Sequence, residues 1–187
     1  MDSLEIKPIW TDDDYASMGW HDCVIRAVAF MDDSDYSADQ YDSELAFDVD
    51  YIFQWILNEN QGYSFGISPC TLVFEGAYDV SLNLTTVGYT PVFSQIIDLT
   101  IEPDKELLER NFRRYDVRIE LERSAMITFQ STGFKQYVRK PPILSRRQWL
   151  TLPERGGVCF DRTAIAKTIG LPSLSISSQQ TEKGGNR

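Results

Sequence analysis

The residues best suited to chemistry near neutral pH are the single histidine and three aspartates in the first third of the chain. His21 lies in the sequence Trp20-His21-Asp22. A histidine gains and loses its proton near neutral pH, so it can act as a general acid or base. The other interpretation is structural, with a ring nitrogen bonded to a backbone carbonyl. Asp22 follows directly, although a neighbour in sequence need not contact the ring.

Asp48 and Asp50 form the second candidate pair. Positions i and i+2 of a strand project to the same face, so both carboxylates could reach one metal ion or one water molecule. The same spacing also suits the solvated face of a half-buried sheet. If His21 and Asp22 occupy the neighbouring strand, four ionisable groups converge, as in a carboxylate-centred hydrolase or a metal-binding enzyme.

Other familiar sites are missing from the sequence. No G-x-S-x-G elbow or glycine-rich phosphate loop occurs, and the acidic run at residues 12–14 lacks the glycine and final glutamate of a calcium loop. A Cys-His pair would need His21 with Cys23, for which a buried thiol is the alternative. The three cysteines, Cys23, Cys70 and Cys159, are too widely spaced for a zinc knuckle or a disulfide framework. We therefore expect no cofactor.

Composition limits the partners. The chain has 187 residues, room for one domain, with 28 acidic and 18 basic side chains and a net charge of −10. This charge repels nucleic acid and anionic lipid and attracts basic proteins, unless it serves solubility alone. Residues 31–43 read as an acidic surface loop. Its candidate partner-binding residues are Asp32, Asp33, Asp35, Asp39 and Asp42.

Strands must position these groups. Large apolar side chains occupy every second position from Leu45 to Trp55, a period of two that predicts a strand with Asp48 and Asp50 on its outward face. Alternation and turn residues predict further strands at 23–30, 63–67, 71–75, 80–85, 96–102, 115–122 and 124–130. We expect a mainly β fold, an antiparallel sheet folded as a sandwich or partly open barrel, with one or two short helices.

The expected domain organisation has three parts. Residues 1–17 form a lead-in that packs through Trp10, residues 18–142 form the β-rich domain, and residues 143–187 form an extension. Residues 105–110 predict a helix of about two turns, and residues 162–169 predict another, with Asp161 as N-cap. Ser, Gln and Gly after residue 172 predict a loose tail. Because the sequence has neither a secretory leader nor a long apolar run, we expect a cytoplasmic protein.

Four segments resemble an uncharacterised family of small bacterial cytoplasmic proteins over residues 18–140. They are Gly19-Trp20-His21-Asp22, Phe47-Asp48-Val49-Asp50-Tyr51-Ile52, Ser68-Pro69-Cys70-Thr71-Leu72-Val73-Phe74 and Gly133-Phe134-Lys135-Gln136. The resemblance implies a bacterial origin and a β-rich fold. Some members of that family look like immunity proteins that neutralise polymorphic toxins.

We therefore expect a non-enzymatic protein-binding module, an immunity-type protein whose acidic residues meet a basic toxin. The alternative is the hydrolase or metal-binding enzyme that uses His21, Asp22, Asp48 and Asp50. A third hypothesis is an adaptor that docks through the basic segment 139–147 and the helix after it.

Overall fold

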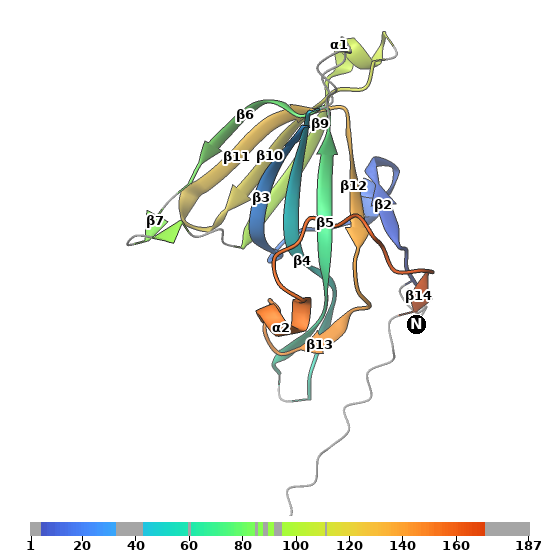
Figure 1. The fold of residues 1–187 in the computed structure, drawn as a ribbon, viewed down its shortest axis with the longest axis vertical. Helices are drawn as coiled ribbons and strands as arrows, with labels where there is room; N and C mark the ends of the chain where they lie inside the picture. Colours follow the sequence, from blue (N-terminus) through green and yellow to red (C-terminus); the bar gives the residue numbers. More distant parts are fainter. Residues whose placement is uncertain are drawn as a thin grey trace, which may run out of the picture.

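Antiparallel strands dominate the computed structural model, which describes residues 5–32, 43–59, 61–84, 86–87, 90–91, 95–110 and 112–170. Within these residues the strands form two main sheets that do not close into a barrel (Figure 1). The predicted mainly β fold, a sandwich with short helices, is therefore confirmed.

The larger sheet has six strands. Its order is β2 (Ile9–Thr11), β12 (Gly133–Val138), β5 (Tyr63–Glu75), β4 (Ser43–Leu57) and β3 (Val24–Asp32), and β13 (Ile143–Ser145) also pairs with β5. The smaller sheet has the order β6 (Tyr78–Asn83), β11 (Ala125–Ser131), β10 (Tyr115–Leu121) and β9 (Ile96–Pro103). Two small pairs are β1 (Glu5–Ile6) with β14 (Ile169–Gly170) and β7 (Thr86–Val87) with β8 (Thr90–Pro91).

The helices are short. They are η1 (Asp12–Ser17), α1 (Lys105–Leu108), η2 (Glu122–Ser124) and α2 (Leu152–Arg155). Asp104 caps α1, because its Oδ1 accepts from the backbone amides of Glu106 and Leu107. The helix predicted over residues 105–110 is present, but it ends at Leu108 and is shorter than the two turns predicted. None of the described helices has the length and apolar character needed to cross a membrane.

Aromatic side chains join the two sheets into one core. The ring of Phe129 on β11 lies 4.7 Å from that of Phe74 on β5 and 6.2 Å from that of Phe47 on β4. A backbone hydrogen bond also links the two sheets at one corner, where the amide of Ile96, the first residue of β9, donates to the carbonyl of Cys23 at 2.8 Å, just before β3. The core therefore lies between the inner faces of both sheets.

The alternation along β4 is confirmed over its first half. Leu45, Phe47 and Val49 are fully buried, as the period of two predicts. A β-bulge between Ile52 and Gln54 then moves the later residues to the other face, so Trp55 points outward and is 44% exposed. The prediction that all six apolar residues face inward is wrong at this position.

The opposite face of β4 is also buried, contrary to expectation. Asp48 and Asp50 have no exposed surface. Residues 150–162, the covering segment, lie over this face and contact it, for example through Thr71, whose hydroxyl donates to the carbonyl of Asp161 at 2.7 Å. The prediction of an outward, solvated aspartate pair is therefore wrong, because the C-terminal part of the chain folds back over the sheet.

Strand β5 is continuous through Pro69, where the sequence predicts two strands. The carbonyl of Pro69 accepts from the amide of Arg139 at 3.1 Å, so the missing N–H of the proline faces the gap between β12 and β13. No ladder hydrogen bond is lost there, which is why a proline is tolerated inside a central strand.

Both ends of the domain pack more closely than the sequence suggests. Trp10 is buried, as expected, and β2 around it pairs with β12. The helix predicted at residues 162–169 is wrong: these residues are irregular apart from β14, and the carboxylate of Asp161 accepts from the amide and hydroxyl of Thr163. Ile165 bonds instead to the carbonyl of Val138, a tertiary partner that competes with helix formation. The predicted loose tail lies outside the described residues.

Candidate functional site

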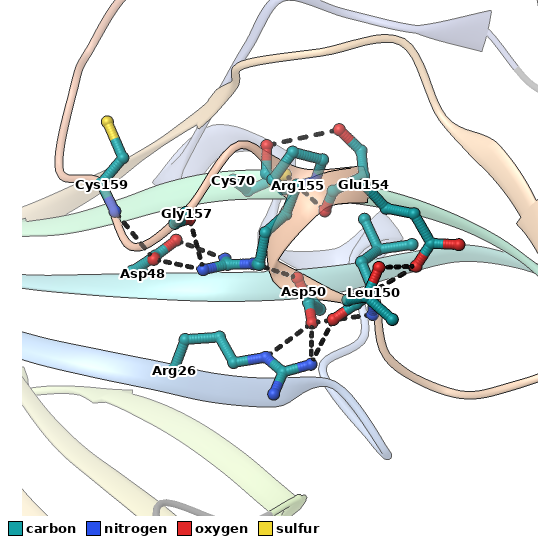
Figure 2. A network of polar contacts seen from close by, with 12 residues as sticks. Arg26, Asp48, Asp50, Cys70, Leu150, Glu154, Arg155, Gly157 and Cys159 are labelled. Atoms are coloured by element: carbon teal, nitrogen blue, oxygen red, sulfur yellow. Dashed lines mark hydrogen bonds and ion pairs between the residues drawn. The ribbon is translucent and has the colours of Figure 1, made fainter.

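Asp48 and Asp50 are held by arginines rather than by solvent or by the histidine. Figure 2 shows the guanidinium of Arg155, from the end of α2, lying beside both carboxylates. Its two terminal nitrogens each donate to Asp48 at 2.6 Å, and its Nε donates to Asp50 at 3.0 Å. The side chain of Arg155 has no exposed surface. This geometry is a bidentate buried ion pair with a third bond to a second carboxylate.

Two further arginines complete the network. Arg139, directly after β12, donates from Nη2 to Asp48. Arg26 occupies a bulge in β3 and donates to Asp50 from Nε at 2.8 Å. Arg26 also bonds to the carbonyl of Leu150 at 2.7 Å.

Backbone amides use the remaining acceptor capacity. The amide of Cys159 donates to Asp48 and that of Leu150 donates to Asp50, both at 3.0 Å. All four carboxylate oxygens of the pair thus already accept hydrogen bonds, most of them from cations. Among the described residues there is no group of three or more His, Cys, Asp or Glu that could hold a metal ion. The pair therefore serves as an anchor for the covering segment.

The charge of Arg155 is kept by its partners. Burial disfavours the charged guanidinium, but hydrogen bonds and Coulomb attraction from Asp48 and Asp50 outweigh this, so the pKa of Arg155 lies above its usual value. Three guanidinium groups share two carboxylates, which leaves one excess positive charge in the network.

His21 and Asp22 lie together but apart from this network. The Nδ1 of His21 is 2.7 Å from the carbonyl of Ile97, and its Nε2 is 3.7 Å from Asp22. Asp22 accepts from Gln148 at 2.8 Å. No contact joins either residue to Asp48 or Asp50 in the described part of the chain. The hydrogen bond between His21 and the carbonyl of Ile97 matches the structural interpretation of the histidine. The predicted cluster of His21, Asp22, Asp48 and Asp50 does not form.

The predicted acidic loop is largely outside the described residues. Asp33, Asp35, Asp39 and Asp42 all fall there, and Asp32 is described only as the last residue of β3. The predicted partner-binding role of these aspartates therefore stays a prediction.

A different acidic surface is described on the smaller sheet. Its outward side chains on β9 and β10 include the carboxylates of Asp98, Glu102, Asp116 and Glu120, which we call the acidic sheet face. They line a shallow hollow of about 590 Å³ that also includes Asp79. Among the described residues that line it, Arg118 is the one basic side chain, and it pairs with Glu120 at 2.7 Å.

The register of the acidic sheet face places like charges opposite one another. Asp116 is the direct cross-strand partner of Glu102, and Glu120 is that of Asp98. Directly opposed like charges destabilise an antiparallel pair, by up to about 1 kcal/mol each. Gln130 donates to Asp116 at 2.8 Å and Arg118 pairs with Glu120, so these two partners offset part of the repulsion within the sheet.

Two of the three cysteines are buried structural thiols. Cys23 and Cys70 have no exposed surface, and burial raises the pKa of the Cys23 thiol to about 12 and raises the pKa of Cys70 as well. Cys159 is partly exposed and accepts a hydrogen bond from the amide of Asp161. A Cys23-His21 pair is not formed, since the sulfur of Cys23 accepts instead from the amide of Ile52.

Comparison of the chain with protein-family models, with curated proteins and with solved structures finds no match. The resemblance to an uncharacterised bacterial family therefore stays a prediction.

Sequence reasoning missed Arg26, Arg139 and Arg155. For Arg155 a signal was present, because Thr151 and Glu154 have the spacing of a capping box and mark a helix start. That signal locates α2 but not its partner, since Arg155 and Asp48 are separated by 107 residues.

Proposed function

We propose that this protein is a non-enzymatic protein-binding module whose acidic sheet face holds a basic partner, and that it acts as an immunity-type protein neutralising a basic toxin in the bacterial cytoplasm. The observation that carries the proposal is the direct opposition of carboxylates, Glu102 with Asp116 and Asp98 with Glu120, on the outward face of the smaller sheet.

A basic partner would relieve this repulsion. Lysine or arginine side chains placed between the opposed carboxylates would form favourable pairs on both strands, and the net charge of −10 would speed the encounter. Thr100, between Asp98 and Glu102 on β9, and Thr128 on β11 also line the hollow and add hydroxyl groups for hydrogen bonding. The toxin as partner rests on the sequence resemblance alone.

The enzymatic alternative has no observation in its favour. It requires free carboxylates at Asp48 and Asp50, and these oxygens bind Arg26, Arg139 and Arg155.

The test is a binding titration against basic toxin domains encoded beside the gene, repeated at several salt concentrations. We expect a complex whose dissociation constant weakens as salt rises. Glu102→Lys should weaken it at least about tenfold, since a like charge would face the partner. The same substitution should raise the free energy of unfolding by about 0.5 kcal/mol, because it converts a repulsive cross-strand pair into an attractive one.

Glu59→Lys is the matched control. Glu59 is exposed in the turn between β4 and β5, at the far end of the molecule from the top of β9 (Figure 1). Glu59→Lys makes the same charge change as Glu102→Lys and should leave both the affinity for the toxin and the free energy of unfolding unaltered. If no salt-sensitive complex forms with any of these toxins, the proposal that the partner is a basic toxin is refuted. If a complex forms and Glu102→Lys does not weaken it, the proposal that the acidic sheet face binds the partner is refuted.

A further inference from the structure

A second, oppositely charged feature lies where the covering segment meets the end of β12. A cavity of about 230 Å³ is lined on one side by Arg139 and Lys140, and on the other by Arg155, Cys159 and Asp161. Cavities of this size accommodate an ion such as phosphate or a small organic acid.

Arg139 lines this cavity and carries one donor without a partner. Its side chain is only 8% exposed, its Nη1 donates to the carbonyl of Cys159 and its Nη2 to Asp48. Its Nε is buried and has no acceptor among the described residues. A buried N–H without a partner is costly, so such groups almost always bind something.

Lys140 supplies a free charge at the same place. Its side chain lies against Gly156, where an added Cβ would come within 2.7 Å of the ammonium nitrogen. Within the described residues no acceptor or ion-pair partner is found for this ammonium. Lys140 and Arg139 both line the cavity, and an ammonium together with a guanidinium N–H is the donor set that recognises an oxyanion.

The balance of charge at the cavity is positive, although the whole chain is acidic. Among the described residues, three cations line it against one carboxylate, that of Asp161. This carboxylate is already committed, because bonds from the amide and hydroxyl of Thr163 hold it and lower the pKa of Asp161. Asp48, behind the lining, cancels one further positive charge, which leaves a net charge of +1.

We propose that this cavity is a binding site for a small oxyanion, a phosphate or a carboxylate, held by Arg139 and Lys140. The bound anion would bridge the end of β12 to the covering segment. Binding therefore also stabilises the folded protein, by mass action on the native state. This inference is independent of the acidic sheet face and of any protein partner.

The experiment is a titration of the whole protein with inorganic phosphate, and separately with acetate and citrate, at constant ionic strength. The readout is the NMR signals of arginine Nε–Hε groups in ¹⁵N-labelled protein, together with the midpoint of thermal unfolding. We expect saturable movement of one Nε–Hε signal in the millimolar range or below, and a rise in the midpoint. Tighter binding of phosphate would identify the ligand as a phosphate, and tighter binding of acetate or citrate would identify it as a carboxylate.

Lys140→Gln should weaken binding about tenfold, the effect of losing one charge-assisted hydrogen bond. Lys105→Gln in α1, at the opposite end of the molecule (Figure 1), makes the same charge change and should leave binding unchanged. The side chain of Lys140 is exposed and bonds to no described residue, while its backbone carbonyl, which accepts from the hydroxyl of Ser68, is kept in the variant, so the variant should fold. Absence of saturable binding of all three anions, or equal affinity in Lys140→Gln and the unmodified protein, would overturn the proposal.

Discussion

The buried anchor of the covering segment predicts a large and specific loss of stability when Arg155 is replaced by methionine. Methionine keeps much of the length and apolar volume of the side chain but removes its charge and all its donors. Asp48 and Asp50, both without exposed surface, would then each lose a cationic partner.

The size of the loss follows from what remains. Removing one member of a buried ion pair costs about 3 to 5 kcal/mol, because a charge is left buried without compensation. Here Asp48 keeps Arg139 and one amide, and Asp50 keeps Arg26 and one amide. We therefore expect the lower end, about 3 kcal/mol, which for a domain of this size lowers the midpoint of thermal unfolding by about 6 to 12 °C.

Urea unfolding followed by tryptophan fluorescence measures this directly, since Trp10 and Trp20 are buried in the folded state. Arg147→Met is the matched control in the same part of the chain. Arg147 pairs with Glu154, but both side chains are more than a third exposed, so its loss should cost less than about 1 kcal/mol. Equal stabilities for the two variants would show that the buried network does not anchor the covering segment.

Two further predictions concern the same domain. Gly156→Ala should lower the free energy of unfolding by about 1 to 2 kcal/mol in urea, because Gly156 has a φ of +84° and a new Cβ would meet Lys140; an unchanged stability would contradict the backbone geometry at the end of α2. Stability should also fall as pH rises from 9 to 12, since unfolding restores the pKa of Cys23 from about 12 to its usual value near 9, and the stabilisation present below pH 9 is lost over that interval. Cys23→Val should reduce this dependence and leave the part due to the buried thiol of Cys70, and an identical slope in the variant would assign the loss to other groups.

Most strands were predictable because they depend on the alternation of apolar and polar residues over a few neighbouring positions. Alternation from Val117 to Leu121 repeats every two residues and matches the buried positions of β10, and alternation from Leu45 to Val49 predicted strand β4, although both faces of that part of β4 are buried. Helix α1 was predictable for a similar reason, because its cap, Asp104, is adjacent in sequence.

Local patterns failed where a distant segment supplied the partner. Residues 162–169 have a helix-like start at Asp161, yet Ile165 bonds to β12 and Ile169 pairs with Ile6 of β1. The bulge that turns Trp55 outward also has no clear sign in the sequence, since it depends on how β5 pairs alongside.

The candidate site shows the same division more sharply. The sequence by itself determined that Asp48 and Asp50 share one face of a strand, since a period of two allows nothing else. It also determined the net charge of −10.

Only the tertiary structure decided what that face meets. The covering segment brings Arg155 back across more than a hundred residues and converts an apparent solvated pair into a buried ionic anchor. The register of β9 with β10 decided that Glu102 and Asp116 stand opposite each other. The physical reason is that periodicity specifies which side a residue faces, whereas its environment depends on which distant elements pack there and in what register.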